Sequence, residues 1–200
     1  MLKLGLTGGI ASGKSWVASQ LRDLGFRVLD ADSLGHKLME PGHSAYAELV
    51  DHFGREILYP DNFIDRKKLG AIVFADPVKL ARLNAILHPK IESAMNAQFE
   101  AWRTEGTTQP VFVEAALLVE AGMHKRLDGL VVVYCSPEQQ IKRLTSRGLG
   151  ENEARRRIAL QLPNEEKLKH ATYTIDTSGT IEQSREQVES LAKNLRATFS

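Results

Sequence analysis

Residues 8–15 carry the run G-G-I-A-S-G-K-S, which satisfies the pattern G-x-x-x-x-G-K-[ST] at every defined position. An apolar segment precedes the run and a helical pattern follows it, which is the context in which this spacing holds phosphate. Glycines let the backbone wrap closely around phosphate oxygens, so that several N–H groups point inward at a helix N-terminus. Lys14 can reach the β- and γ-phosphates, and the Ser15 hydroxyl can join a Mg²⁺ shell. The sequence therefore predicts a site for a nucleoside triphosphate with Mg²⁺.

Eight residues of this loop and the helix that follows are the expected ATP contacts: Gly8, Gly9, Ala11, Ser12, Gly13, Lys14, Ser15 and Trp16. The dinucleotide fingerprint G-x-G-x-x-G is absent from the run, which argues against a nicotinamide or flavin enzyme. Lys14 is also an expected catalytic residue, since it would bear on the transferred phosphate.

Three acids follow predicted strands. Asp32 lies just past the segment 27–30 and borders the region that follows, so we expect it to orient or deprotonate an attacking hydroxyl. The alternative is that Asp30 or Asp32 caps the helix beginning near Ser33. Glu114 ends another apolar segment, where it could bind Mg²⁺ through water or serve only as a structural acid.

Basic residues crowd into the stretch 143–157, together with two glutamates. Arginine suits the charge that spreads over a phosphoryl group during transfer, and a mobile segment carrying it would close over ATP and exclude water. Arg143 and Arg147 are the expected catalytic members. The remaining arginines are expected to form the solvated face of a helix.

Short apolar runs bounded by glycine, proline or acids indicate buried parallel strands. We expect five, at 2–7, 27–30, 111–114, 130–135 and 173–175. Helical patterns between them, beginning with 14–24, predict an α/β fold with three layers, α/β/α, around a five-stranded parallel sheet.

No strand is expected between Ser33 and about Gly106. Asp65 should cap a helix over 66–74, a second helix should run over 78–87, and Pro89 should begin a third that reaches about Arg103. An insertion of this length is too long for a loop and predicts a helical subdomain that holds a second substrate. The alternative is additional packing without ligand contact.

These patterns predict three regions. Residues 1–35, 106–140 and 164–200 form the nucleotide-binding core, 36–105 a helical acceptor domain and 141–163 a small helical lid.

Composition excludes several classes of protein. Of 200 residues, 42% are hydrophobic and 26% charged, as in soluble globular proteins, and the formal net charge is +1, which gives no general attraction to nucleic acid or membranes. The single cysteine, Cys135, permits no intramolecular disulfide, and the six histidines show no H-E-x-x-H spacing. We expect a cytoplasmic protein whose only metal is the Mg²⁺ that accompanies ATP.

The sequence resembles the dephospho-CoA kinase family over nearly its whole length. The phosphate loop alone would indicate only a P-loop protein, but further elements follow in the family's order: D-A-D at 30–32, F-A-D-P at 74–77, L-H-P at 87–89 and L-L-V-E at 117–120. Gln140 with Arg143 and Arg147, then R-I at 157–158 with Gln161, complete the pattern.

This resemblance implies a P-loop kinase that uses ATP to phosphorylate the ribose 3′-hydroxyl of dephospho-CoA, the last step of coenzyme A biosynthesis. It implies that Asp32 assists this hydroxyl, that His88 lies on the acceptor side, and that Arg143 and Arg147 belong to the lid. From the residues alone, His88 before Pro89 is an ordinary helix-entry residue. The small-molecule partners are then ATP and dephospho-CoA.

The chain departs from the family pattern in four places. Ala11 replaces a frequent glycine, which is compatible with a negative φ, and Trp16 replaces a small residue and must pack on the core or the lid. Ala116 replaces a proline, and Thr177 lies where an asparagine is usual, which removes the basis for a nucleotide-base contact there.

Two alternatives remain open. One is another small P-loop kinase that acts on a nucleoside, nucleotide or sugar, since all share the same donor machinery. The other is a GTPase-like switch. The switch should carry N-K-x-D for guanine, which the sequence lacks, and its two D-x-x-G matches begin at Asp51 and Asp176, within a predicted helix and near the C-terminus.

Overall fold

The computed structural model describes residues 1–198, which divide into two compact units. The sheet unit comprises Met1–Asp30 and the chain from Thr107 onward, and the helical unit comprises Ala31–Gly106. Within residues 1–198, no helix is long and apolar enough to cross a bilayer.

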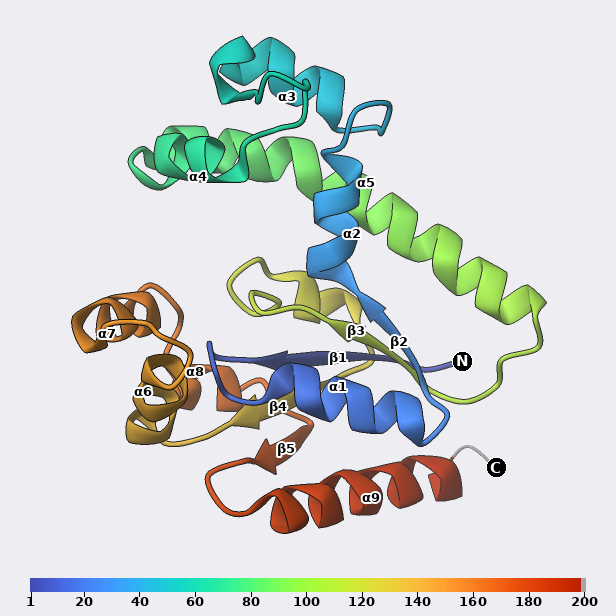
Figure 1. Ribbon diagram of the computed structural model, residues 1–200. Coiled ribbons are helices and arrows are strands. Elements are labelled where there is room, and N and C mark those ends of the chain that lie inside the picture. The colour runs from blue at the N-terminus through green and yellow to red at the C-terminus, as the bar shows by residue number, and fades with distance from the viewer. Residues whose placement is uncertain (199–200) are drawn as a thin grey trace. The chain divides into compact units, whose positions relative to one another are not determined.

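The sheet unit is built on five parallel strands in the order β2-β3-β1-β4-β5 (Figure 1). Their bounds are Lys3–Gly8 (β1), Arg27–Asp30 (β2), Val111–Glu114 (β3), Gly129–Tyr134 (β4) and Tyr173–Asp176 (β5). This confirms the predicted α/β fold and its five strands. Since β1 lies between β3 and β4, the chain turns to opposite sides of β1, and in open parallel sheets ligands bind at the carboxyl end of such a switch point.

One face of the sheet packs against two long helices, α1 (Lys14–Asp23) and α9 (Ile181–Thr198), which also contact each other. Alternate residues of each strand point to this face, as expected for a pleated strand. Leu4 and Leu6 of β1 are buried there with Val17 of α1. Trp16 packs, half-buried, against the same cluster, so its indole belongs to the core of the sheet unit rather than to the lid.

The opposite face of the sheet is covered by the chain between β3 and β4, which includes the short helix η2 (Met123–Arg126), and by α8 (Asn164–Leu168). A Cβ on Gly5 would stand 2.7 Å from Leu130 Cδ1 and 3.1 Å from Leu118 Cδ1, so the side chains of this segment pack directly on the β1 backbone. Thr7, two residues along, donates to Ala116 O at 3.2 Å. The helices of this second layer within the sheet unit are therefore short.

The predicted lid coincides with two helices of the sheet unit, α6 (Pro137–Thr145) and α7 (Glu151–Ala159), which contact each other. Ser136 caps α6 by accepting a hydrogen bond from Gln139 N at 3.2 Å. The arginines at 155–157 are exposed and pair with Glu151 and Glu153 of their own helix. These three arginines form the expected solvated face.

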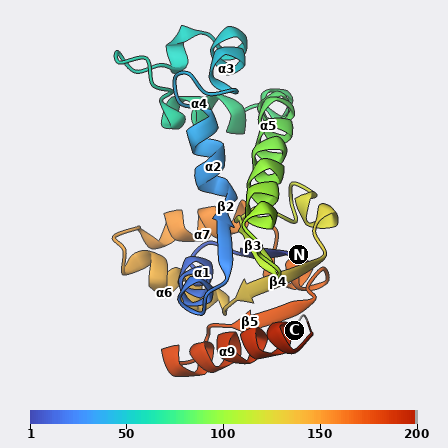
Figure 2. The same ribbon diagram turned by 90° about the vertical axis from the view of Figure 1, so that its right-hand side faces the viewer.

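The helical unit contains no strand among its residues, as predicted, and only an isolated bridge between Leu58 and Ile64. Its helices are α2 (Ala31–Leu38), α3 (Tyr46–Phe53), the short η1 (Arg55–Ile57), α4 (Arg66–Phe74) and α5 (Pro77–Thr104). Figure 2 shows α2 and α5 running side by side within this unit, where they are in contact. Asp65 caps α4 as predicted, accepting from the N–H groups of Lys67 and Lys68.

The expected helix boundary at Pro89 is wrong. Helix α5 runs without a break through Pro89, and His88 lies within the helix rather than at its entry. An internal proline removes one backbone hydrogen bond and costs about 3 kcal/mol. Buried residues on both sides of the proline, Ile86 before it and Met95 and Phe99 after it, hold the two halves in one helix and offset this cost.

Candidate active site

The phosphate-binding loop connects the last residue of β1 to the first residue of α1 at the switch point of the sheet. Gly13 has φ +91°, a left-handed conformation that favours glycine, and it is the N-cap of α1. Gly8 is required for a different reason, since a Cβ there would stand 2.3 Å from Val133 O. The loop is thus closely seated on β4.

The expectation of a negative φ at Ala11 is wrong, because Ala11 has φ +59°. Alanine in the left-handed region costs about 1–2 kcal/mol relative to the right-handed one. The loop meets this cost through contacts on the Ala11 carbonyl, which accepts a hydrogen bond from Arg143 Nη1 at 3.0 Å.

The Lys14 side chain is paired with Glu114 at the end of β3. Lys14 Nζ lies 2.8 Å from Glu114 Oε1, and Arg22 of the last turn of α1 lies 3.3 Å from Glu114 Oε2. Glu114 is buried, so two cations balance a carboxylate that would be costly to bury alone. The arrangement joins the phosphate-binding lysine to the predicted magnesium acid.

Ser12 and Ser15 differ in exposure. Ser15 is exposed on the first turn of α1, where its hydroxyl is accessible to a ligand. Ser12 is buried, and within residues 1–198 its hydroxyl has no hydrogen-bond partner. A buried polar group without a partner is unfavourable, so this loop retains unused capacity for a polar ligand.

Arg143 connects the loop to the residue that follows β5. Besides Ala11 O, its guanidinium donates to Thr177 O at 2.6 Å and to Thr177 Oγ1 at 3.0 Å. Thr177 is buried and its hydroxyl also contacts Ser12 O. The threonine that replaces the usual asparagine therefore ties β5 to the loop. Arg147, by contrast, is exposed just beyond the end of α6.

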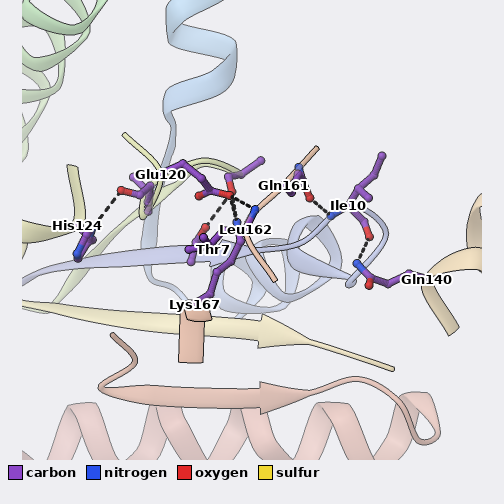
Figure 3. Close-up of polar contacts among 10 residues, drawn as sticks. Thr7, Ile10, Glu120, His124, Gln140, Gln161, Leu162 and Lys167 are labelled. Carbon is purple, nitrogen blue, oxygen red and sulfur yellow. Dashed lines mark hydrogen bonds and ion pairs between the residues drawn. The ribbon is translucent and has the colours of Figure 1, made fainter. Parts of the chain in front are cut away.

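Two glutamines hold the loop at Ile10. Gln161 Oε1 accepts a hydrogen bond from Ile10 N at 2.6 Å, and Gln140 Nε2 donates to Ile10 O at 2.7 Å (Figure 3). Both glutamines belong to the family pattern, but residue chemistry alone assigned neither of them a role.

An ion pair with one buried partner lies beside this contact. Lys167 is fully buried and binds Glu120 Oε1 at 2.7 Å and Ala116 O at 3.0 Å, while Leu162 N donates to the same carboxylate oxygen (Figure 3). Glu120 itself is exposed. Sequence reasoning missed Lys167, since a lysine in the charged run 165–169 carries no signal of burial.

In the helical unit, Asp32 occupies the exposed first turn of α2, and His88 lies partly buried in the middle of α5. The two helices cross where a Cβ on Gly35 would meet Ile91 Cδ1 at 3.2 Å. Asp32 precedes Gly35 by three residues and His88 precedes Ile91 by three, so each lies one helical turn from the crossing.

A cavity of about 660 Å³ opens in the same unit. Its walls include Ser33, His36 and Lys37 of α2, which follow Asp32 on the exposed side of the helix, with Tyr59, Phe63 and Arg66. The lining therefore combines basic groups and aromatic rings with one acid, Glu40, and the apolar Met39 and Ile64.

A phosphate loop at the switch point of a parallel sheet, with its lysine paired to an acid on the neighbouring strand, defines the class of P-loop kinases. Solved structures of shikimate kinases share this fold, among them that of Bacteroides thetaiotaomicron, with a TM-score of 0.54 at 13% identity over 98% of both chains.

Residues 2–183 match the family model for dephospho-CoA kinase, CoaE. The chain is 48% identical to the dephospho-CoA kinase of Geobacter metallireducens over 195 residues, 96% of each chain. It is 45% identical to that of Carboxydothermus hydrogenoformans over 186 residues, 92% of this chain and 90% of the relative. The chain belongs to the dephospho-CoA kinase family.

Two solved structures are similar to this chain over nearly its whole length. TT1252 from Thermus thermophilus has a TM-score of 0.85 and 33% identity, covering 100% of this chain and 98% of that one. The dephospho-CoA kinase of Campylobacter jejuni has a TM-score of 0.72 and 28% identity, covering 98% of both chains.

Proposed function

We propose that this protein transfers the terminal phosphate of ATP to the ribose 3′-hydroxyl of dephospho-CoA, giving coenzyme A and ADP. The observation that carries the proposal is the complete phosphate loop, ending in the Lys14–Glu114 pair, in a chain that matches the dephospho-CoA kinase family over residues 2–183. In this proposal, ATP is bound by the regions 1–35, 106–140 and 164–200. The acceptor is bound by residues 36–105, and residues 141–163 form the lid. A cytoplasmic location stays a prediction.

The loop binds the donor. Its N–H groups and the N-terminus of α1 attract the phosphates, and the unused Ser12 hydroxyl supports a polar ligand in this loop. Lys14 then exchanges Glu114 for the β- and γ-phosphates. Arg22 remains on Glu114 after this exchange, so the buried carboxylate keeps a counter-charge.

The residues present also fit a magnesium ion bound with ATP. Mg²⁺ prefers hard oxygen ligands, and the exposed Ser15 hydroxyl and the Glu114 carboxylate, acting through water, supply them once Lys14 has turned to the phosphates. The ion would neutralise charge on the β- and γ-phosphates.

The helical unit binds the acceptor. Dephospho-CoA combines a diphosphate with a long pantetheine arm, and the cavity beside α2 offers His36, Lys37 and Arg66 for the former and aromatic rings for the latter. Asp32 precedes the cavity residues on α2 and is joined to β2 through Ala31 alone. His88 faces the same helix crossing from α5.

In the reaction, Asp32 accepts a hydrogen bond from the 3′-hydroxyl, orients its oxygen and takes up its proton as the bond to phosphorus forms. Lys14 stabilises the charge that develops on the transferred phosphoryl group. Arg147 of the lid is exposed and adds its positive charge to the same group when the lid closes. Arg143 acts indirectly, because it positions the loop through its hydrogen bonds to Ala11 and Thr177.

A coupled ADP-release assay tests the proposal directly. MgATP is combined with dephospho-CoA, adenosine, AMP, gluconate or shikimate. ADP formation with dephospho-CoA alone, with a product mass equal to that of coenzyme A, is expected. Turnover only with another acceptor would retain the donor site and overturn the acceptor assignment.

A further inference from the structure

Ile10 is the one residue of the phosphate loop whose backbone N–H and C=O both bind side chains among the contacts of residues 1–198. Gln161 accepts its N–H and Gln140 donates to its carbonyl (Figure 3). Gln140 is buried in α6, and Gln161 lies two residues beyond the end of α7. Two adjacent peptide groups of the loop are therefore held, one on each side of the Ile10 Cα, by the chain that precedes the predicted lid and by the lid's last residues.

Gly9 makes room for this contact. A Cβ at position 9 would stand 2.8 Å from Gln140 Nε2, 3.2 Å from Asn164 Oδ1 and 3.7 Å from Gln161 Oε1. The three amides thus gather over the backbone of residue 9, and a Cβ there would displace the Gln140 amide and crowd that of Asn164.

The backbone next to Gln161 is anchored. Leu162 N donates to Glu120 Oε1 at 3.1 Å, and the same oxygen is held by the buried Lys167. The main chain at this point is therefore fixed to the sheet unit, whereas the terminal carboxamide of Gln161 can still turn about its last torsion, which has a broad energy profile.

An oxygen that accepts a 2.6 Å hydrogen bond from an N–H of this loop occupies the position of a phosphate oxygen. Ile10 lies two residues beyond the end of β1 and four before the first residue of α1, whose N-terminus attracts phosphates. A phosphate oxygen that reaches the Ile10 N–H then belongs to the end of the triphosphate that lies farther from α1. A carboxamide carries an acceptor and a donor on one rotatable group.

We propose that Gln161 distinguishes ATP from ADP. Without a terminal phosphate, its oxygen accepts the Ile10 N–H. With ATP bound, the Ile10 N–H passes to a terminal phosphate oxygen, and the Gln161 carboxamide turns so that its NH₂ donates to that oxygen. Gln140 keeps its hydrogen bond to the Ile10 carbonyl in both states and so fixes the backbone next to this N–H. This role deepens the proposed function and rests on ATP as the donor.

The test compares the dissociation constants of β,γ-imido-ATP and ADP, each with Mg²⁺, by calorimetry. In Gln161→Glu, the carboxylate can still accept from Ile10, but it cannot donate and it repels the terminal phosphate. We expect binding of β,γ-imido-ATP to weaken about tenfold or more, while ADP changes less than about threefold. Gln161→Ala removes the donor without adding charge, and the same ratio should shift about threefold to tenfold.

Gln109→Glu is the matched control, because it adds the same charge at an exposed position just before β3. This position lies at the amino end of the parallel strands, whereas the phosphate loop lies at their carboxyl end. Its two dissociation constants should equal those of the wild type. A Gln161 that only holds the loop in place would weaken both nucleotides alike in Gln161→Ala, and this result overturns the proposal. Unchanged constants in Gln161→Glu also overturn it, because they would show that no terminal phosphate lies near residue 161.

If Gln161→Glu fails to fold, as judged by circular dichroism, the ratio measured in Gln161→Ala decides alone. The assay contains no acceptor, so an error in the acceptor assignment does not affect it. An error in the donor assignment would appear separately, as a wild-type protein that binds neither nucleotide.

Discussion

The sheet unit and the helical unit use their polar side chains in different ways. In the sheet unit, side chains from three other elements converge on the phosphate loop: Gln140 and Arg143 from α6, Gln161 from beyond α7 and Thr177 from beyond β5. In the helical unit, Asp65 and Asp76 cap helices, and the basic groups beside α2 line an open cavity. The loop that we propose binds ATP is thus held in place without a ligand, whereas the proposed acceptor unit presents an accessible surface.

The physical reason lies in the two ligands. A triphosphate has dense charge and a compact shape, and preorganised N–H groups and a lysine bind it best. Dephospho-CoA is long and flexible, so a cavity of about 660 Å³ with scattered cations and rings suits it. The two units should therefore fail in different ways when their key residues are changed.

The largest effect is expected for Lys14→Ala in the sheet unit. Loss of the ammonium group removes a charge that acts on the donor phosphates, while Arg22 still provides a counter-charge for Glu114. We expect kcat/KM to fall about 10³-fold or more, with weaker ATP binding, in the ADP-release assay. Lys169→Ala, which changes an exposed lysine, is the control. Full activity in Lys14→Ala would remove the basis of the donor assignment.

A change at Asp32 in the helical unit should separate turnover from donor binding. Asp32→Asn retains the size of the side chain but cannot take up a proton. We expect kcat to fall about 10²-fold or more, while the dissociation constant for ATP stays within about twofold. Asp51→Asn, at an exposed position of α3, should match the wild type. If turnover and ATP affinity fell together, Asp32 would instead be a structural cap.

The ion pair between Lys167 and Glu120 in the sheet unit tests how much this contact stabilises the fold. Lys167→Met leaves the exposed Glu120 without its partner and removes one donor from Ala116 O. We expect the free energy of unfolding to fall by about 1–2 kcal/mol in urea denaturation, because the carbonyl loses a hydrogen bond whereas the exposed carboxylate stays solvated. Adding Glu120→Gln should recover part of the loss. A change as small as that of the exposed Lys169→Met would show that the pair contributes little.

The smallest effect is expected for the cap of α4 in the helical unit. Burial alone would raise the pKa of Asp65, but hydrogen bonds from the N–H groups of Lys68 and Lys67 outweigh it and the pKa lies below its usual value. Asp65→Ala should lower the melting temperature by about 2–4 °C at pH 7.

The effect of Asp65 should depend on pH in one direction. Because its pKa is lowered on folding, its contribution is present above the unfolded value of about 3.9 and is lost as the pH falls through the folded value. The melting curves of wild type and Asp65→Ala should therefore converge in acid. Asp65→Ser, which keeps a capping oxygen, should lie between them at pH 7, and a difference that grew in acid would contradict this account.

The sequence predicted the two units unequally. All five strands lie within one residue of the expected ends, because each is a short apolar run with polar boundaries. The helix cap at Asp65 was also predicted, since a cap involves neighbours two or three residues away. The prediction at Pro89 was wrong because the local preference of proline is opposed by burial on both sides of it in α5.

By itself, the sequence determined the phosphate loop, the alternation of strands and helices, the helical insertion and the kinase family, since each rests on residue types at short spacing. The tertiary structure decided the strand order, the left-handed backbone conformation of Ala11, the burial of Lys167 and the hydrogen bonds of two glutamines to the Ile10 backbone. Those last contacts join residues 151 and 130 positions apart. No local pattern encodes them, because they arise only when packing of the strands and helices brings distant segments together at the carboxyl end of the sheet.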